Sequence, residues 1–186
     1  AKKFGHSITN LVPALVPLCG SPEITKPMKG MRVREVTLTL IGEKKLAKTQ
    51  GEILFTDYGL SGIAAMELAS FAQNYIDSVK CTPFTVIDFM PGMAYNEMVE
   101  YLQNLCKIKG FCNMDNLLTG FLPKAVGIAI CKASSLYKSD KKISELTAKD
   151  LKIIAEKIKN FPIEITGTKG FANAQVTGGG INTDEI

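Results

Sequence analysis

The hydrophobic pattern of this chain has the period of β-strands towards both ends and the period of helices through most of its middle. Val36, Leu38 and Leu40 alternate with polar residues, as in a strand with one buried face. From residue 95 to residue 160, apolar side chains instead recur every three or four positions. This order fits an antiparallel sheet or a small barrel with a helical block inserted between its strands, an α+β fold.

The boundaries of several elements are predicted from local signals. Gln50-Gly51 indicates a break between a short return strand and a further strand over 52–56. Ser61 is the predicted N-cap of a helix, and Thr147-Ala148-Lys149-Asp150 resembles the capping box of another. Two final strands are predicted over 162–166 and 172–177, separated by a turn at 167–170.

Composition narrows the class of protein. The 186 residues are 46% hydrophobic and 22% charged with a net charge of +4, typical of a soluble globular protein with a lysine-rich surface. Basic residues and aromatics do not interleave along any one element, so we expect no nucleic-acid partner. No apolar run is long enough to span a membrane, and we expect no membrane partner.

The cysteines and the single histidine also exclude some functions. None of the five cysteines forms a C-x-x-C pair, and His6 is the only histidine, so no zinc site is expected. An odd number of cysteines without a signal peptide indicates a reducing, cytoplasmic location. The abrupt start at Ala1 and stop at Ile186 fit a piece excised from a longer chain.

Two segments are candidates for ligand contact, each with a purely structural alternative. Thr177, Gly178, Gly179 and Gly180 either bring backbone N–H groups close to a ligand or form a tight turn. Residues 55–62 run from a strand into a helix start, which either attracts a polar ligand or is simply a capped helix. No Ser-His-Asp, Cys-His or paired-carboxylate arrangement follows from the spacing, so the catalytic residues are unknown.

At these segments the sequence resembles the HI0933-like flavoproteins, which include BaiN-type and aminoacetone-oxidase-like oxidoreductases. The matching stretches occur in the order found in that family. They are 5–9 leading to 12–18, then 51–62, Leu122-Pro123, and 174–181. The family often has His where Asp57 stands and Pro where Ile63 stands, so the resemblance gives position 57 no role as a base.

The resemblance implies an insert domain that lacks the segments binding FAD. It predicts a small antiparallel β-barrel, residues 1–91 and 161–186, carrying an all-helical subdomain, residues 92–160. The parent enzyme would pass hydride between NAD(P)H, FAD and a small organic substrate, with FAD held by a flanking Rossmann domain of the same polypeptide. This fragment would bind no FAD and have no activity alone.

The resemblance also assigns the two candidate segments. Residues 177–180 would approach the flavin edge, while Tyr58, Gly59, Ser61 and Gly62 would line the adjoining substrate cavity. The helical block would either cover that cavity or pack on the barrel. The alternatives from a different class are a stand-alone β-barrel module that binds a ligand or RNA, and a structural or interaction protein.

Overall fold

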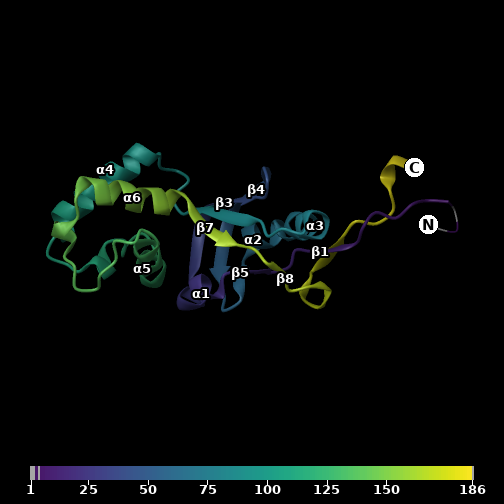
Figure 1. Cartoon of the computed structure of the whole chain (residues 1–186), viewed down its shortest axis with the longest axis horizontal. Coiled ribbons are helices and arrows are strands. Elements are labelled where there is room, and N and C mark those ends of the chain that lie inside the picture. Colours follow the sequence, from purple (N-terminus) through teal and green to yellow (C-terminus); the bar gives the residue numbers. More distant parts are fainter. Residues whose placement is uncertain (1–2, 4, 186) are drawn as a thin grey trace.

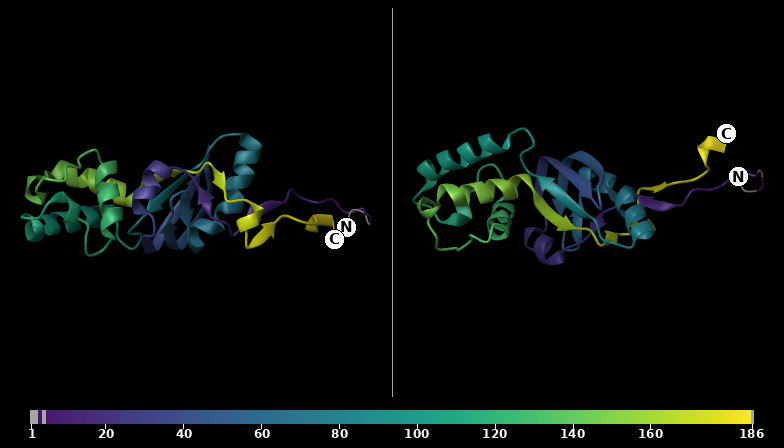
Figure 2. Two further views of the ribbon diagram at one scale, coloured as in Figure 1. Left: turned by 90° about the horizontal axis from the view of Figure 1, so that it is seen from below. Right: turned by 45° about the horizontal axis from the view of Figure 1, so that its top comes forward.

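The computed structural model describes residues 3 and 5–185. Three parts follow one another along its long axis (Figure 1): a group of helices, a central sheet with two helices against it, and a two-stranded ribbon. Both described ends of the chain lie at the tip of the ribbon, far from the helices. Two further views agree that these end segments run side by side (Figure 2).

The strands form two antiparallel sheets. A seven-stranded sheet has the order β7-β6-β3-β4-β5-β2-β8, and β1 pairs with β9 in a separate two-stranded sheet. Every pairing between these strands is antiparallel, which is the sheet type predicted from the sequence. The bounds are β1 Val12–Ala14, β2 Leu18–Cys19, β3 Arg32–Ile41, β4 Lys45–Phe55, β5 Gly59–Ser61, β6 Phe84–Asp88, β7 Phe161–Glu164, β8 Gly167–Thr168 and β9 Val176–Gly178.

Strand β3 carries the alternating pattern. Val36, Leu38 and Leu40 are fully buried, so the predicted buried face is confirmed. Between Val33 and Val36 the pairing of β3 with β4 shifts register, and Glu35 in this bulge has φ +56°. The bulge turns Arg34 and Glu35 outward while Val33 stays buried.

Strand β4 corrects one prediction. It is continuous from Lys45 to Phe55, so Gln50-Gly51 does not break it. Gly51 pairs with Val36 at the bulge and has φ +154°, which is why glycine occurs inside the strand. A local turn signal was therefore overridden by the pairing of the two longest strands.

The two edge strands of the large sheet are nearly adjacent in the chain. Only Ile165 and Thr166 separate β7, at one end of the strand order, from β8, at the other. The Ile165 N–H donates to Pro83 O at 2.8 Å, and the Thr166 N–H donates to Cys19 O at 2.8 Å. One stretch of chain thus bonds to opposite ends of the sheet.

Helices α2 (Ile63–Glu67) and α3 (Ala69–Val79) follow β5. The N-cap is Gly62, not Ser61 as predicted, and no side chain caps the helix. Gly62 has φ +90°, and a Cβ there would lie 2.6 Å from Glu52 O. The chain turns so close to β4 that only glycine fits, so the backbone contact decides where the helix begins.

The helical part comprises α4 (Tyr95–Lys109), α5 (Lys124–Ala133) and α6 (Ala148–Lys159), with 3₁₀ turns η3 (Met114–Asn116) and η4 (Ile143–Glu145). Thr147 caps α6 as predicted: its Oγ1 accepts from the Asp150 N–H at 3.2 Å. Within the stretch of helical period, residues 114–136 form a 3₁₀ turn followed by α5 after Pro123. A short helix α1 (Pro22–Thr25) with the turn η2 (Lys26–Met28) lies beside α5.

The chain after α6 differs from the two strands predicted there. β7 ends at Glu164, and β8 occupies part of the predicted turn. A 3₁₀ turn η5 (Phe171–Asn173) begins where the second strand was expected, and β9 starts only at Val176. A last 3₁₀ turn, η6, spans Thr183–Glu185. These segments contain few apolar residues, so the pattern carried little information on register.

The sheet and the helical part share one continuous hydrophobic core. Phe89 lies at their junction, with its ring 5.6 Å from that of Phe161 in an edge-to-face contact and 6.5 Å from that of Phe55. Aromatic packing of this kind favours one fixed arrangement of the two parts.

Candidate functional site

The predicted glycine segment lies in the ribbon. Thr177 and Gly178 belong to β9 and pair with Pro13 and Val12. A Cβ on Gly179 would lie 2.2 Å from Asn10 O, so glycine is required there by contact with the neighbouring strand. At Gly180, with φ +144°, a Cβ would meet nothing within 4 Å, so this backbone is open to an approaching ligand.

The polar backbone groups of Gly180 are partly occupied within the ribbon. Its N–H donates to Thr9 Oγ1 at 3.0 Å, and its carbonyl accepts from the Thr9 N–H at 2.8 Å. The bridge between Ile8 and Ile181 continues this pairing towards the chain ends. Thr177 and Gly178 thus lie in β9, and Gly180 continues the backbone pairing beyond its end.

The predicted cavity segment, Tyr58 to Gly62, forms β5 and its flanks. A Cβ on Gly59 would lie 2.3 Å from Leu18 O, so both Gly59 and Gly62 serve close backbone packing. The Tyr58 ring lies 4.7 Å from Lys169 Nζ, and Ser61 Oγ donates to Met66 Sδ at 3.8 Å. This segment thus offers a ligand the Tyr58 side chain and the Ser61 hydroxyl.

The two predicted segments belong to different sheets but neighbour one short stretch of chain. β9 pairs with β1, and β5 pairs with β2, which follows β1 after three residues. The apolar stretch 12–19 thus connects the two candidates. Their roles towards a ligand remain predictions.

Asp57 and His6, two further polar residues near the matching stretches, are engaged in surface pairs. Lys29 Nζ donates to Asp57 Oδ2 at 2.6 Å, and this hydrogen bond holds the pKa of Asp57 below its usual value. His6 Nδ1 lies 3.9 Å from Glu185 Oε2 in the ribbon. An ionised carboxylate tied to a lysine is a poor proton acceptor, so Asp57 is unsuited to act as a base.

Of the five cysteines, Cys131 is buried, Cys19, Cys106 and Cys112 are half-buried, and Cys81 is exposed. Burial is the main cause that raises the pKa of Cys131 to about 12, and it also raises the pKa values of Cys19 and Cys106. Within residues 3 and 5–185, no three His, Cys, Asp or Glu side chains come together in a group that would hold a metal ion. Over the same residues, no helix has the length and apolar character required to cross a bilayer.

The sequence did not predict a cleft of about 690 Å³ between the sheet and the helical part. One wall comes from the β3 bulge and β4, and the other from the connection after β6 and the loop before α5. Its lining residues are Arg32, Val33, Arg34, Glu35, Gln50, Phe89, Met90, Pro91, Gly92, Phe121, Leu122 and Pro123. In a regular strand, residues on one face are two positions apart. The buried residues Val33 and Val36 are three positions apart, and this spacing in the sequence could have indicated the bulge.

The connection that lines this cleft is fixed by one lysine of α6. Lys159 Nζ forms an ion pair with Asp88 Oδ2 at 2.8 Å and donates to the carbonyls of Met90 and Met93 at 2.8 and 2.6 Å. Its side chain is only 13% exposed. These contacts from one cation hold the chain between β6 and α4 against the last turn of α6, together with the Phe89 N–H bond to Ile158 O.

Comparisons with known proteins agree with the sequence resemblance. Residues 12–176 match the family model of the HI0933-like protein barrel and H2TH domain. The chain is 27% identical over its whole length to a 3-dehydro-bile acid delta(4,6)-reductase of Clostridium scindens, covering 45% of that protein. It is 22% identical, again over its whole length, to a ribosomal RNA dihydrouridine synthase of Escherichia coli, covering 43%. The chain thus spans less than half the length of these curated relatives.

Proposed function

Because the chain belongs to the HI0933-like family, we propose that it is the substrate-side insert domain of a flavin-dependent oxidoreductase. The observation that carries this proposal is the ribbon. β1 pairs with β9, and Ile8 pairs with Ile181. The segments that lead into and out of the domain therefore run side by side, on the side of the sheet opposite α4, α5 and α6 (Figure 1). A flanking FAD-binding domain of the same polypeptide would join there.

We further propose that residues 1–91 and 161–186 form a small β-barrel and residues 92–160 a helical subdomain. The barrel is supported by the two hydrogen bonds of the 165–166 stretch, which join the chain between β7 and β8 to opposite ends of the sheet. In a closed barrel the first and last strands of the order lie next to each other, as this short connection between β7 and β8 requires.

The residues of the ribbon are compatible with a flavin edge. Bound FAD would supply hydride transfer between NAD(P)H and a small organic substrate. The open backbone at Gly180 would allow close approach, and Thr9 would hold that backbone in place by its two hydroxyl contacts. The Tyr58 ring and the Ser61 hydroxyl would face the substrate, with Gly59 and Gly62 fixing their backbone.

The first test is whether the intact parent protein is yellow and this 186-residue chain alone is colourless. Gly180→Ala in the parent should lower the FAD content measured by absorbance, because the added methyl occupies the space left for the ligand. Gly170→Ala is the matched control, since it also has positive φ and open space but lies outside the segment. Equal FAD content in both variants would remove residues 177–180 from the cofactor site.

A second candidate substrate is RNA, contrary to the expectation from the sequence that no nucleic acid is bound, and the distribution of charge favours it. Residues 92–160 contain 11 of the 22 basic residues but only 7 of the 18 acidic ones, so this part carries the whole net charge of +4. Basic surfaces attract phosphate backbones. Deleting the parent gene and measuring dihydrouridine in ribosomal RNA would separate the candidates: an unchanged level would exclude RNA, and a loss would exclude a purely small-molecule role.

A further inference from the structure

We propose that the cleft between the sheet and the helical part is a nucleotide-binding site, which takes a phosphate group attached to a flat heteroaromatic ring. A free nucleotide and a nucleotide within an RNA strand present the same chemistry. The cleft volume of about 690 Å³ lies within the range of small-molecule sites, roughly 300 to 1,000 Å³. Such sites often lie between two packed parts of a chain.

The sheet wall of the cleft supplies the cationic groups. Arg32 and Arg34 both pair with Glu52, Arg34 through Nε at 3.8 Å. Two guanidinium groups thus share one carboxylate, and their side chains remain 62% and 85% exposed. Guanidinium groups match phosphate oxygens in geometry, so Arg34, the more exposed and more weakly paired, is the group we assign to phosphate.

Arg34 is positioned by the bulge in β3, where the backbone at the next residue is strained. Glu35 has φ +56°, a conformation that costs free energy for a residue with a side chain. The strain is held by the pairing of Val33 with Ile53 on one side and of Val36 with Gly51 on the other. Strained backbone of this kind is concentrated at ligand sites, and here it lies within the cleft lining. The Glu35 carboxylate is also in the lining, so the phosphate would lie on the Arg34 side of the bulge, away from this carboxylate.

The helical wall supplies flat apolar surfaces. The Phe121 ring is held edge-to-face by Tyr101, with centroids 5.5 Å apart and planes at 84°. Pro91 and Pro123 belong to the same lining, as does Leu122, which is 5% exposed. A base stacks on an aromatic ring whose orientation is fixed, because little side-chain entropy is lost on binding. The Gln50 amide, on the opposite wall, would hydrogen-bond to a base edge.

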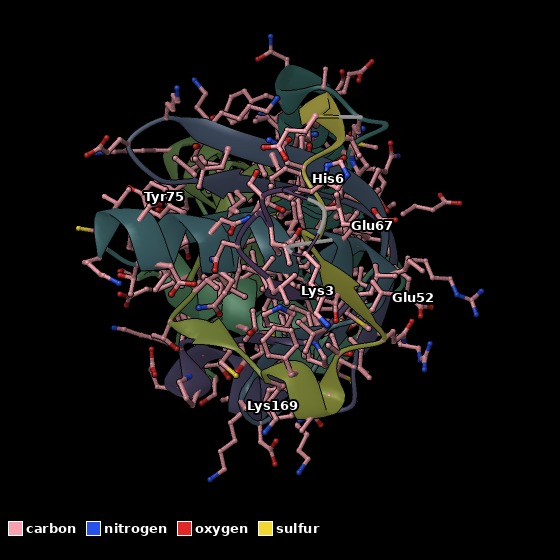
Figure 3. All side chains as sticks on the ribbon, turned by 90° about the vertical axis from the view of Figure 1, so that its right-hand side faces the viewer. Lys3, His6, Glu52, Glu67, Tyr75 and Lys169 are labelled. Carbon is pink, nitrogen blue, oxygen red and sulfur yellow. The ribbon has the colours of Figure 1, made fainter. Side chains whose placement is uncertain are left out.

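The contacts of Lys159 with Asp88, Met90 and Met93 hold the two walls of the cleft in a fixed relative position. Of these residues, Met90 lies in the lining between Phe89 and Pro91. The residues that line the cleft come from the junction of the sheet and the helical part. Gly180 instead accepts a hydrogen bond from the Thr9 N–H just beyond the pairing of β1 with β9, and β1 lies on the side of the sheet opposite α4 and α6 (Figure 1). In the view from the ribbon, Glu52, which pairs with Arg32 and Arg34, lies on one side of the molecule, and Tyr75 of α3 lies on the other (Figure 3). The nucleotide site is therefore separate from the proposed flavin contact.

The test measures binding, not activity, on the intact protein as purified. Calorimetric titrations with AMP, inorganic phosphate and a ten-residue oligouridylate would be compared for the unchanged protein and for Arg34→Gln. We expect Arg34→Gln to weaken nucleotide binding about tenfold or more, the usual effect of losing a charge-assisted hydrogen bond. Lys48→Gln, which removes an exposed cation from β4 outside the cleft, should leave binding unchanged.

Phe121→Leu separates stacking from simple anion binding. It should weaken AMP about tenfold while leaving the weak binding of inorganic phosphate unchanged, because only the base contacts the ring. Arg34-dependent binding that is tighter for AMP than for oligouridylate would indicate a free nucleotide, and Arg34-dependent binding that is tighter for oligouridylate would indicate RNA. Failure of both probes to bind, or equal effects of Arg34→Gln and Lys48→Gln, would overturn the proposal. So would phosphate binding as tight as AMP with no effect of Phe121→Leu.

Discussion

The sheet with its flanking segments and the helical part are built on different physical principles. Residues 1–91 and 161–186 carry 11 basic and 11 acidic residues and have no net charge, whereas residues 92–160 carry +4. In the sheet, backbones approach so closely that Gly20, Gly59 and Gly62 admit no Cβ without a clash. The helices instead pack by buried side chains such as Leu102 and Ile154. Both regions share one core of buried side chains, but the closest backbone contacts, which exclude a Cβ, lie in the first region.

Gly20→Ala should have the largest effect on stability, because it attacks the close backbone packing of the sheet. A Cβ on Gly20 would lie 1.8 Å from Glu164 O. Relieving this overlap must move a strand, which we expect to lower the free energy of unfolding by about 3 kcal/mol. Gly167→Ala has open space around its Cβ and should change stability by about 0.5 kcal/mol or less. Chemical denaturation measures both, and equal values would contradict the close backbone packing assigned to the sheet at Gly20.

Lys159→Met should come next, because it acts where the two regions meet. It leaves Asp88 without its cation and frees the Met90 and Met93 carbonyls. Since the pair is partly solvated, we expect a loss of about 2 kcal/mol, less than for a fully buried pair. Hydrogen exchange of residues 89–93 should rise. Lys152→Met, at an exposed lysine elsewhere on α6, should leave both measurements unchanged.

Thr147→Ala tests the helical part alone and should cost about 1 kcal/mol through loss of the N-cap of α6. Circular dichroism should show fraying of α6 while the sheet signal persists. Thr119→Ala, at an exposed residue in the loop before α5, serves as the control and should be neutral. A loss of sheet signal in Thr147→Ala would show that the two regions unfold together.

The smallest effect is expected from acid titration. The hydrogen bond from the Thr147 N–H is the main cause that lowers the pKa of Asp150 below its ordinary value of 3.8. The folded state therefore gains stability above pH 3.8, and this gain disappears as pH falls through the lower, folded pKa. In Asp150→Asn the slope of stability against pH should flatten below pH 3.8, as measured by thermal unfolding; an unchanged slope would contradict the assignment.

Elements with strong periodicity or caps were predictable from the sequence. The buried alternation of β3 and the capping box of α6 each depend on neighbouring residues, and both are confirmed. The break expected at Gly51 and the N-cap expected at Ser61 were wrong, because contacts with distant backbone determine both positions. The local signals at Gly51 and Ser61 were real, but contacts with residues elsewhere in the chain decided which structure formed at each position.

The cleft was beyond prediction for the same reason. Arg34 and Phe121 are far apart in the sequence, and no element interleaves basic with aromatic residues. The fold brings them into one lining from opposite walls. The glycine segment, by contrast, was proposed from its three consecutive glycines and from the resemblance, and its role stays a prediction; its close fit against Asn10 could not be foreseen.

The strand order of the large sheet has a consequence for handling this protein at high concentration. Its longest strands, β3 and β4, lie in the interior of the order, while the edges are the four-residue β7 and the two-residue β8. Short edges offer a second molecule few unpaired amide groups, and Pro162 removes one of them from β7. The edges of the large sheet in the folded protein therefore offer few sites where a strand of a second molecule could pair, so fibril formation by edge-to-edge pairing is disfavoured there.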